Sequence, residues 1–160
     1  MNGRSNMLLN RQREAQIPLR PLGNFLRRVQ MELGISGAEL NVCLVSEAAM
    51  RKLNRKFRAK DRSTDVLSFP AEDRARPLGV QCRARKHSSS GGRSFLGDVA
   101  ISPCVARRNA KRLDRRLGEE LRGLILHGVL HLMGYDHESD IGEMDSLEAR
   151  LRWRLGLPQT

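Results

Sequence analysis

Residues 121–134, LRGLILHGVLHLMG, constrain the fold more than any other segment of the chain. The segment is apolar over most of its length and long enough for roughly four helical turns. A helix with so little polar surface has to be covered by other elements, so it predicts a long helix at the centre of the fold. Gly134 predicts the end of this helix, because glycine adopts the left-handed conformation at little cost.

Three histidines fall within the eleven residues HGVLHLMGYDH. His127 and His131 are four residues apart, which places both imidazoles on one face of the helix, as neighbouring zinc ligands require. A turn at Gly134 would bring His137 back toward them. Three neutral nitrogens that leave a fourth position open are typical of a catalytic zinc. The motif therefore predicts one Zn²⁺ ion per chain, although hydrogen-bonded core histidines or an RNA-facing pair would also give two histidines at this spacing.

The position after the first histidine is Gly128, where zinc peptidases carry a glutamate. The histidine spacing otherwise matches that of metzincin peptidases. Peptide hydrolysis needs a carboxylate to move a proton to the leaving amine, whereas phosphodiester cleavage depends more on charge stabilisation and in-line positioning. The missing glutamate thus favours phosphoryl chemistry. Asp136, Glu138 and Asp140 could supply a base, but Asp136 fits better as support for a ligand histidine and the other two as acidic residues around a helix start.

The chain has 160 residues, which is a typical length for one domain. It carries 29 Lys and Arg against 18 Asp and Glu, a formal net charge of +11. This surplus predicts a polyanionic partner, nucleic acid first, although a generally basic surface would give the same charge. There is no apolar run of membrane-spanning length and no signal-peptide pattern, and the three cysteines are widely spaced. We therefore expect no membrane association and a cytoplasmic location.

The remaining sequence predicts an α+β fold, a small four-stranded mixed sheet packed with about five helices and with the metal site at the end of the long central helix. Strand composition is found in residues 5–12, 39–46, 63–70 and 95–102. Helices are expected over residues 22–34, 47–60, 103–116 and 121–134, and from Ser139 to Leu155. Residues 71–95 are rich in Arg, Ser and Gly, and they predict a basic mobile loop inserted into a single domain, 1–160.

Three stretches together resemble the YbeY family of bacterial rRNA-maturation endoribonucleases. They are FRAKDRSTDVLSFP at Phe57–Pro70, LGDVAIS at Leu96–Ser102 and the histidine motif, in the order that the family has them. The resemblance extends from about Leu40 to Leu155. It implies a metal-dependent endoribonuclease that acts on single-stranded RNA in 16S rRNA 3′-end maturation and ribosome quality control. An rRNA precursor and the small ribosomal subunit are the implied partners.

The same resemblance implies roles for individual residues. His127, His131 and His137 match the zinc ligands, and Arg58 matches the functional arginine of the family, so Arg58 and His127 are the implied catalytic residues. The guanidinium of Arg58 would hold a phosphate oxygen through two parallel hydrogen bonds. Residues implied only to shape the cleft are Thr64, Asp65 and Ser68.

The basic helix before the histidine helix is a candidate for sequence-independent contacts with the RNA backbone, which would make affinity depend steeply on salt. Its candidate residues are Arg107, Arg108, Lys111, Arg112, Arg115 and Arg116. Two other functions remain in competition with a zinc endoribonuclease. One is a metzincin-like metallopeptidase whose base comes from elsewhere. The other is a ribosome- or RNA-binding module in which zinc only stabilises the fold.

Overall fold

The computed structural model describes residues 7–71, 94–136 and 141–160. Their strands form one sheet in the order β1-β2-β4-β3, in which β1, β2 and β4 are parallel and β3 is antiparallel to β4. This mixed sheet and five helices confirm the predicted α+β class. The strands are β1 (Met7–Asn10), β2 (Glu39–Leu44), β3 (Val66–Pro70) and β4 (Phe95–Ile101).

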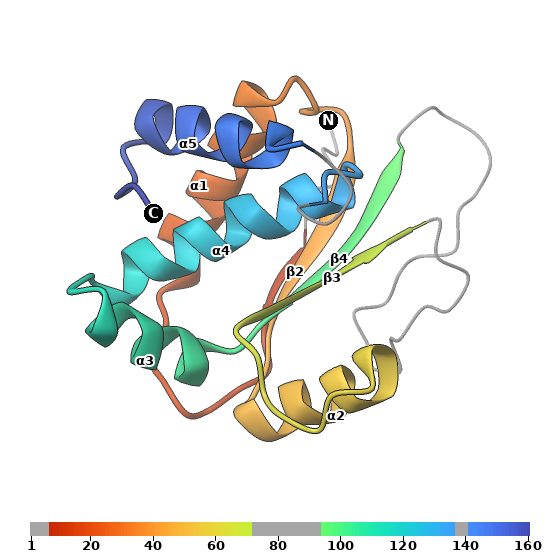
Figure 1. The fold of residues 1–160 in the computed structure, drawn as a ribbon, viewed down its shortest axis with the longest axis vertical. Helices are drawn as coiled ribbons and strands as arrows, with labels where there is room; N and C mark the ends of the chain where they lie inside the picture. Colours follow the sequence, from red (N-terminus) through yellow and green to blue (C-terminus); the bar gives the residue numbers. More distant parts are fainter. Residues whose placement is uncertain (1–6, 72–93, 137–140) are drawn as a thin grey trace.

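Helices cover both faces of the sheet (Figure 1). α1, α4 and α5 lie on one side, α3 packs against α4, and α2 lies on the opposite side. No helix in the described ranges is long and apolar enough to cross a lipid bilayer. The helices are α1 (Leu19–Glu32), α2 (Glu47–Arg58), α3 (Pro103–Arg112), α4 (Leu117–Leu132) and α5 (Glu143–Leu155).

Two apolar clusters reflect the alternation of side chains along the strands. In β2, Leu40, Val42 and Leu44 join the larger cluster with α1, α4 and α5, whereas Cys43 faces the smaller cluster under α2. Because both faces are covered, the middle strands are buried on both sides. The sheet thus holds α4 and α2 in fixed positions on its two faces.

The central helix is as buried as its composition predicts, and it starts earlier than expected. α4 begins at Leu117, because Glu119 in its first turn accepts a hydrogen bond from the Arg116 backbone N–H at 2.9 Å. Gly134 takes the expected left-handed conformation, with φ of +94°, after the last turn. The end of α4 is therefore placed as the sequence predicts, with His131 in its last turn.

Other helix boundaries differ from the prediction. α2 ends at Arg58 and not at Lys60, because Ala59 turns the chain with φ of 54°. α3 ends at Arg112 rather than at residue 116. α5 begins at Glu143, behind Gly142 with φ of +89°, and Ser139, expected as its cap, lies outside the described residues. Most of the predicted loop, residues 72–93, lies outside them as well.

Candidate functional site

A cleft of about 690 Å³ lies beside the C-terminal half of α4, and we call it the histidine cleft. Its walls come from α4, from the end of α2 with the loop that follows, and from β3. The polar residues that line it include His127, His131, Arg58, Lys60, Arg62, Thr64, Ser68, Tyr135 and Asp136. The sequence-predicted His127, His131 and Arg58 therefore share one cleft.

The two histidines approach each other closely within this cleft. Their Nε2 atoms are 3.1 Å apart, and their ring centroids are 4.7 Å apart at an angle of 74°. This juxtaposition follows from their four-residue spacing on α4. Two ring nitrogens therefore meet at one point in the cleft.

The other nitrogen of His127 is held by α5. His127 Nδ1 lies 2.9 Å from Glu148 Oε2, and Glu148 is buried. Burial by itself would raise the pKa of Glu148, but the hydrogen bond from His127 and the ion pair with Arg152 outweigh it and lower the pKa. An ionised carboxylate only accepts, so His127 Nδ1 donates, and the lone pair of a neutral ring lies on Nε2.

The ion pair with Arg152 fixes the carboxylate itself. Arg152 Nε donates to Glu148 Oε1 at 3.0 Å, and Arg152 Nη1 donates to the carbonyl of Pro158 at 2.9 Å. Arg152 is buried and lies one helical turn after Glu148 on α5. The carboxylate thus has a partner for each oxygen, which restricts the orientation of the His127 ring.

Gly128, where a peptidase would have its glutamate, faces the sheet. A Cβ atom there would lie 2.6 Å from Val99 Cγ1 and 3.1 Å from Val99 Cγ2. Ser68 Oγ also donates to the Gly128 carbonyl at 3.1 Å. α4 lies so close to β3 and β4 that no side chain fits at position 128 without displacing the buried Val99.

Arg58 is the last residue of α2 and borders the histidine cleft. Lys60 and Arg62 follow it along the same wall, and all three side chains are exposed. Within the described ranges none of the three makes a side-chain ion pair. Their positive charge is therefore free to meet an anion in the cleft.

The six predicted α3-region cations do not line this cleft. Arg108 donates to Glu47 from both guanidinium Nη atoms, one of them at 2.9 Å, and Arg116 pairs with Glu119 at 3.0 Å. Arg115 lies 3.6 Å from a carboxylate oxygen of Glu120. Arg112 donates to the side chain of Asn109 at 2.7 Å. Most of the positive charge expected to contact RNA is thus bound to acceptors within the protein.

The third expected metal ligand, His137, lies outside the described residues, as do Glu138 and Asp140. In the part of the chain that is described, no three His, Cys, Asp or Glu side chains are grouped as a metal site would need. His127 and His131 are the described residues whose nitrogens converge. Asp98, buried in β4, accepts a hydrogen bond from Asn41 Nδ2 at 2.8 Å.

Sequence reasoning did not identify Glu148. A signal was present, because Glu148 and Arg152 are four residues apart on a helix whose Met144, Leu151 and Leu155 are buried. A charged pair on an apolar face indicates residues that are held in the interior with a partner. Which histidine the carboxylate meets, however, depends on how α5 packs against α4.

The fold and site together define a small α+β protein with paired histidines in a cleft bordered by cations. Residues 8–156 match the family model described as Endoribonuclease YbeY. The chain therefore belongs to the YbeY family, which confirms the resemblance found in the sequence.

Individual relatives agree with this assignment. The chain is 42% identical to the endoribonuclease YbeY of Koribacter versatilis over 96% of its length and 88% of the relative. It is 45% identical to that of Solibacter usitatus, over 84% and 77% of the two chains. The solution structure of TM1509 from Thermotoga maritima is 27% identical and superposes with a TM-score of 0.57, covering 94% of this chain and 92% of the other.

Proposed function

We propose that this protein is a zinc-dependent endoribonuclease that cleaves single-stranded RNA in the histidine cleft. Its relatives are named endoribonucleases, which supports an endoribonuclease role. The observation that carries the proposal is the convergence of His127 and His131 in a cleft that also contains Arg58.

The histidine geometry fits a zinc ion. Two nitrogens at adjacent corners of a tetrahedron, each about 2.0–2.1 Å from the metal, lie about 3.3–3.4 Å apart. The Nε2 atoms of His127 and His131 are 3.1 Å apart, within a few tenths of an ångström of that separation. The hydrogen bond from His127 Nδ1 to Glu148 leaves its Nε2 available as a ligand. We propose His137 as the third ligand.

When bound, zinc would supply Lewis-acid activation of water near neutral pH. The chain's own residues hold the substrate. Arg58 can bind a phosphate oxygen through its planar guanidinium, and Lys60 and Arg62 add positive charge along the same wall. Charge that develops on the phosphoryl oxygens during cleavage would be stabilised by these cations.

The packing at Gly128 weighs against a peptidase that has its carboxylate directly after the first histidine, because the space there is filled by Val99. Phosphodiester cleavage does not require this group. We further propose, from the family, that the substrate is an rRNA precursor, that cleavage contributes to 16S rRNA 3′-end maturation on the small ribosomal subunit, and that the protein acts in the cytoplasm.

The proposal is tested by cleavage of a labelled single-stranded RNA by the purified protein beside His131→Ala and Arg58→Ala. We expect cutting by the parent protein, and at least a 100-fold loss in each variant while circular dichroism shows a native fold. Zinc content, measured separately, should fall in His131→Ala and stay at one ion per chain in Arg58→Ala. Equal cutting by the parent and by both variants would indicate a contaminating nuclease. Bound zinc without cutting would favour an RNA-binding module.

A further inference from the structure

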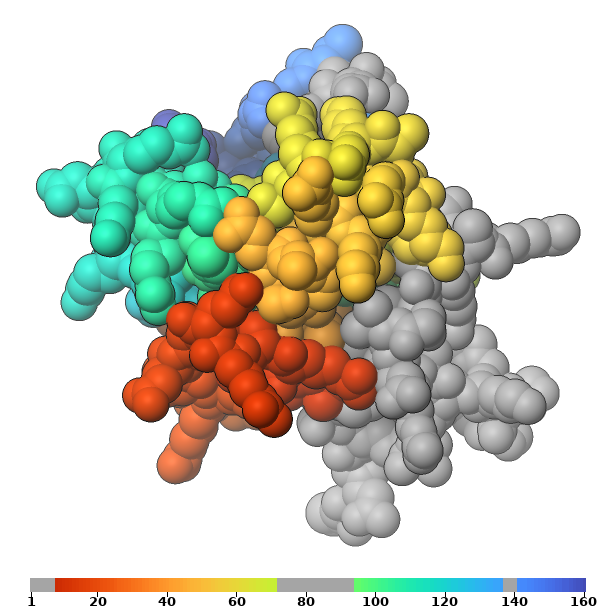
Figure 2. All heavy atoms as spheres, turned by 90° about the horizontal axis from the view of Figure 1, so that it is seen from below, coloured from red at the N-terminus to blue at the C-terminus, as the bar shows by residue number. Residues whose placement is uncertain are grey.

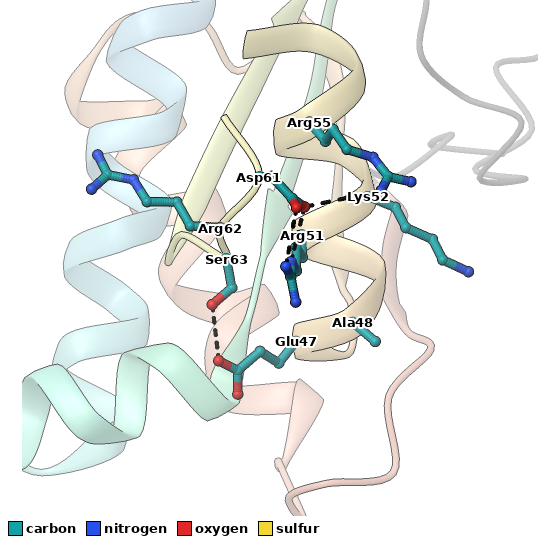
Figure 3. Close-up of a pocket in the computed structure, with 8 residues that line it drawn as sticks. All are labelled: Glu47, Ala48, Arg51, Lys52, Arg55, Asp61, Arg62 and Ser63. Carbon is teal, nitrogen blue, oxygen red and sulfur yellow. Dashed lines mark hydrogen bonds and ion pairs between the residues drawn. The ribbon is translucent and has the colours of Figure 1, made fainter. Parts of the chain in front are cut away.

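A second cleft, of about 840 Å³, lies along the exposed side of α2. We call it the α2 cleft. Its lining residues are charged or polar except for Ala48, and no aromatic side chain of the described residues contributes to it. Figure 3 shows its residues, which are Glu47, Ala48, Arg51, Lys52, Arg55, Asp61, Arg62 and Ser63.

The α2 cleft adjoins the histidine cleft. Arg62 and Ser63 line both of them. In Figure 3, Lys52 and Arg55 lie at one edge of the cleft and Arg62 at the other, and their side chains point in opposite directions. An extended ligand can therefore pass from one cleft to the other along Arg62.

The loop that carries Arg62 is anchored to α2 at two points. Asn54, buried in α2, donates from Nδ2 to the Arg62 carbonyl at 2.8 Å. Arg51 donates to both oxygens of Asp61, from Nε at 2.9 Å and from Nη2 at 3.1 Å. These bonds hold the loop against the helix, so the boundary between the two clefts has a fixed position.

Both carboxylates of the α2 cleft are already bound. Asp61 is held by Arg51, and Glu47 accepts hydrogen bonds from Arg108 and Ser63. Lys52 makes no ion pair with any described residue, and Arg55 approaches Asp61 only at 4.0 Å. The cleft therefore presents positive charge that the protein itself does not neutralise.

The positive charge of the neighbouring basic helix is neutralised only in part. α2 (orange to yellow) and α3 (green) lie next to each other on the face seen in Figure 2. In the α3 region Arg108, Arg115 and Arg116 are paired with carboxylates, whereas Arg107 and Lys111 have no ion pair with the described residues. The two helices thus offer competing surfaces for the same polyanion, and of the two only α2 lines the histidine cleft.

We infer that single-stranded RNA held in the histidine cleft continues past Arg62 into the α2 cleft, where Lys52 and Arg55 bind its phosphates. The inference rests on the proposed function and names a second subsite for its substrate. Contacts of ammonium and guanidinium groups with phosphates carry no base information, and the described residues of the cleft include no aromatic ring on which bases could stack. The subsite therefore binds the RNA backbone irrespective of sequence and favours long substrates over short ones.

The test compares Lys52→Ala/Arg55→Ala with Arg107→Ala/Lys111→Ala, which removes the same charge from exposed positions of α3. Binding is measured in the His131→Ala background, with single-stranded RNAs of about 20 and about five nucleotides, over a range of salt concentrations. We expect the α2 variant to bind the long RNA roughly tenfold more weakly at 100 mM salt, and its salt slope to fall by about 1.4, or 0.7 per lost phosphate contact. The α3 variant should keep the preference of the parent for the long RNA.

An equal loss of affinity for the long RNA in the two variants, or a larger loss in the α3 variant, would overturn the inference. Either result would mean that the RNA does not follow α2 and that binding depends on the positive charge of the surface in general. Thermal unfolding of both variants confirms that they are folded.

Cleavage by the parent protein is assayed in parallel. Absence of cutting with the expected α2 effect on binding would overturn the proposed function and leave the α2 subsite standing. Absence of RNA binding by the parent would overturn the subsite.

Discussion

Glu148 and His127, from different helices, form a 2.9 Å hydrogen bond between Oε2 and Nδ1 that determines which nitrogen of the histidine faces the cleft. The second carboxylate oxygen is bound by Arg152 at 3.0 Å. Since α5 contributes both Glu148 and Arg152, the orientation of a residue on α4 depends on the packing of α5. The His127 ring is therefore carried by α4 and oriented by α5.

Replacing Glu148 by Gln should weaken zinc binding about 10- to 100-fold. An amide can turn its NH₂ group toward Nδ1, which would make Nδ1 an acceptor and move the ring proton to the nitrogen that has to bind the metal. Zinc affinity is measured by competition with a chelator, on protein shown to be folded by circular dichroism. Glu143→Gln, an exposed change on the same helix, should keep the parent affinity. An unchanged affinity in Glu148→Gln would contradict the role given to this residue.

Replacing Gly128 by Ala should lower the free energy of unfolding by about 1–3 kcal/mol, because the new Cβ would overlap the buried, branched side chain of Val99. Gly118→Ala, on the same helix, is the matched control. Its Cβ would meet nothing closer than Arg122 Nη2 at 3.9 Å, so the protein should gain about 0.4–1 kcal/mol from the loss of chain freedom in the unfolded state. Urea unfolding measures both changes, and a neutral Gly128→Ala would show that α4 can move away from the sheet.

The contact between Gly128 and Val99 is an example of a feature of the site that could not be predicted from the sequence, whereas the approach of the two histidines could be. The approach of His127 to His131 follows from helix periodicity, which is local. That Gly128 faces Val99 could not be predicted, because it depends on the rotation of α4 over β4. Arg108 looked available for RNA, but it is paired with Glu47, 61 residues away in sequence. Charge patterns predict how many cations a helix has, and only tertiary contacts decide which of them are free.

In the fold as well, features that depend on neighbouring residues were predicted from the sequence, and features that depend on distant contacts were not. Strand and helix types were predicted from residue patterns, and α2 is capped locally by Ser46, which accepts a hydrogen bond from the Ala49 backbone N–H at 3.2 Å. The strand order β1-β2-β4-β3 was not predicted, because the antiparallel pairing of β3 with β4 depends on contacts across the sheet. The start of α5 was missed because Gly142 is an unusual N-cap with a left-handed conformation.

Replacing Glu47 by Gln should destabilise the protein at neutral pH, with a difference that disappears in acid. The hydrogen bond from Arg108, followed by those from Ser63 and Cys104, lowers the pKa of Glu47 from 4.5 to about 2. A group whose pKa is lowered on folding stabilises the protein above its unfolded pKa, and this contribution is lost as the pH falls through the folded pKa.

The expected loss for Glu47→Gln is about 1 kcal/mol at pH 7, because Arg108 and Glu47 keep 54% and 34% of their side-chain surface exposed and water screens the pair. Urea unfolding of the parent and the variant is compared at several pH values. The gap in the free energy of unfolding should be constant above about pH 5 and should close between about pH 4.5 and pH 2. A gap that does not change with pH would mean that Glu47 acts through packing rather than charge.

Replacing Ala59 by Gly should stabilise the protein, although the same change in a helix is normally destabilising. Ala59 has φ of 54°, in the left-handed region where a side chain with a Cβ costs about 1 kcal/mol or more relative to glycine. Part of the gain is offset because glycine is more flexible in the unfolded chain, so the net increase in the free energy of unfolding should be a few tenths to about 1 kcal/mol. Ala48→Gly, at an exposed position in the first turn of the same helix, should instead lower the free energy of unfolding by about 0.5–1 kcal/mol.

Opposite signs for one substitution at the two ends of α2 would show that the left-handed turn before the loop of Arg62 is strained. Equal losses at both positions would show that the turn accommodates alanine without strain.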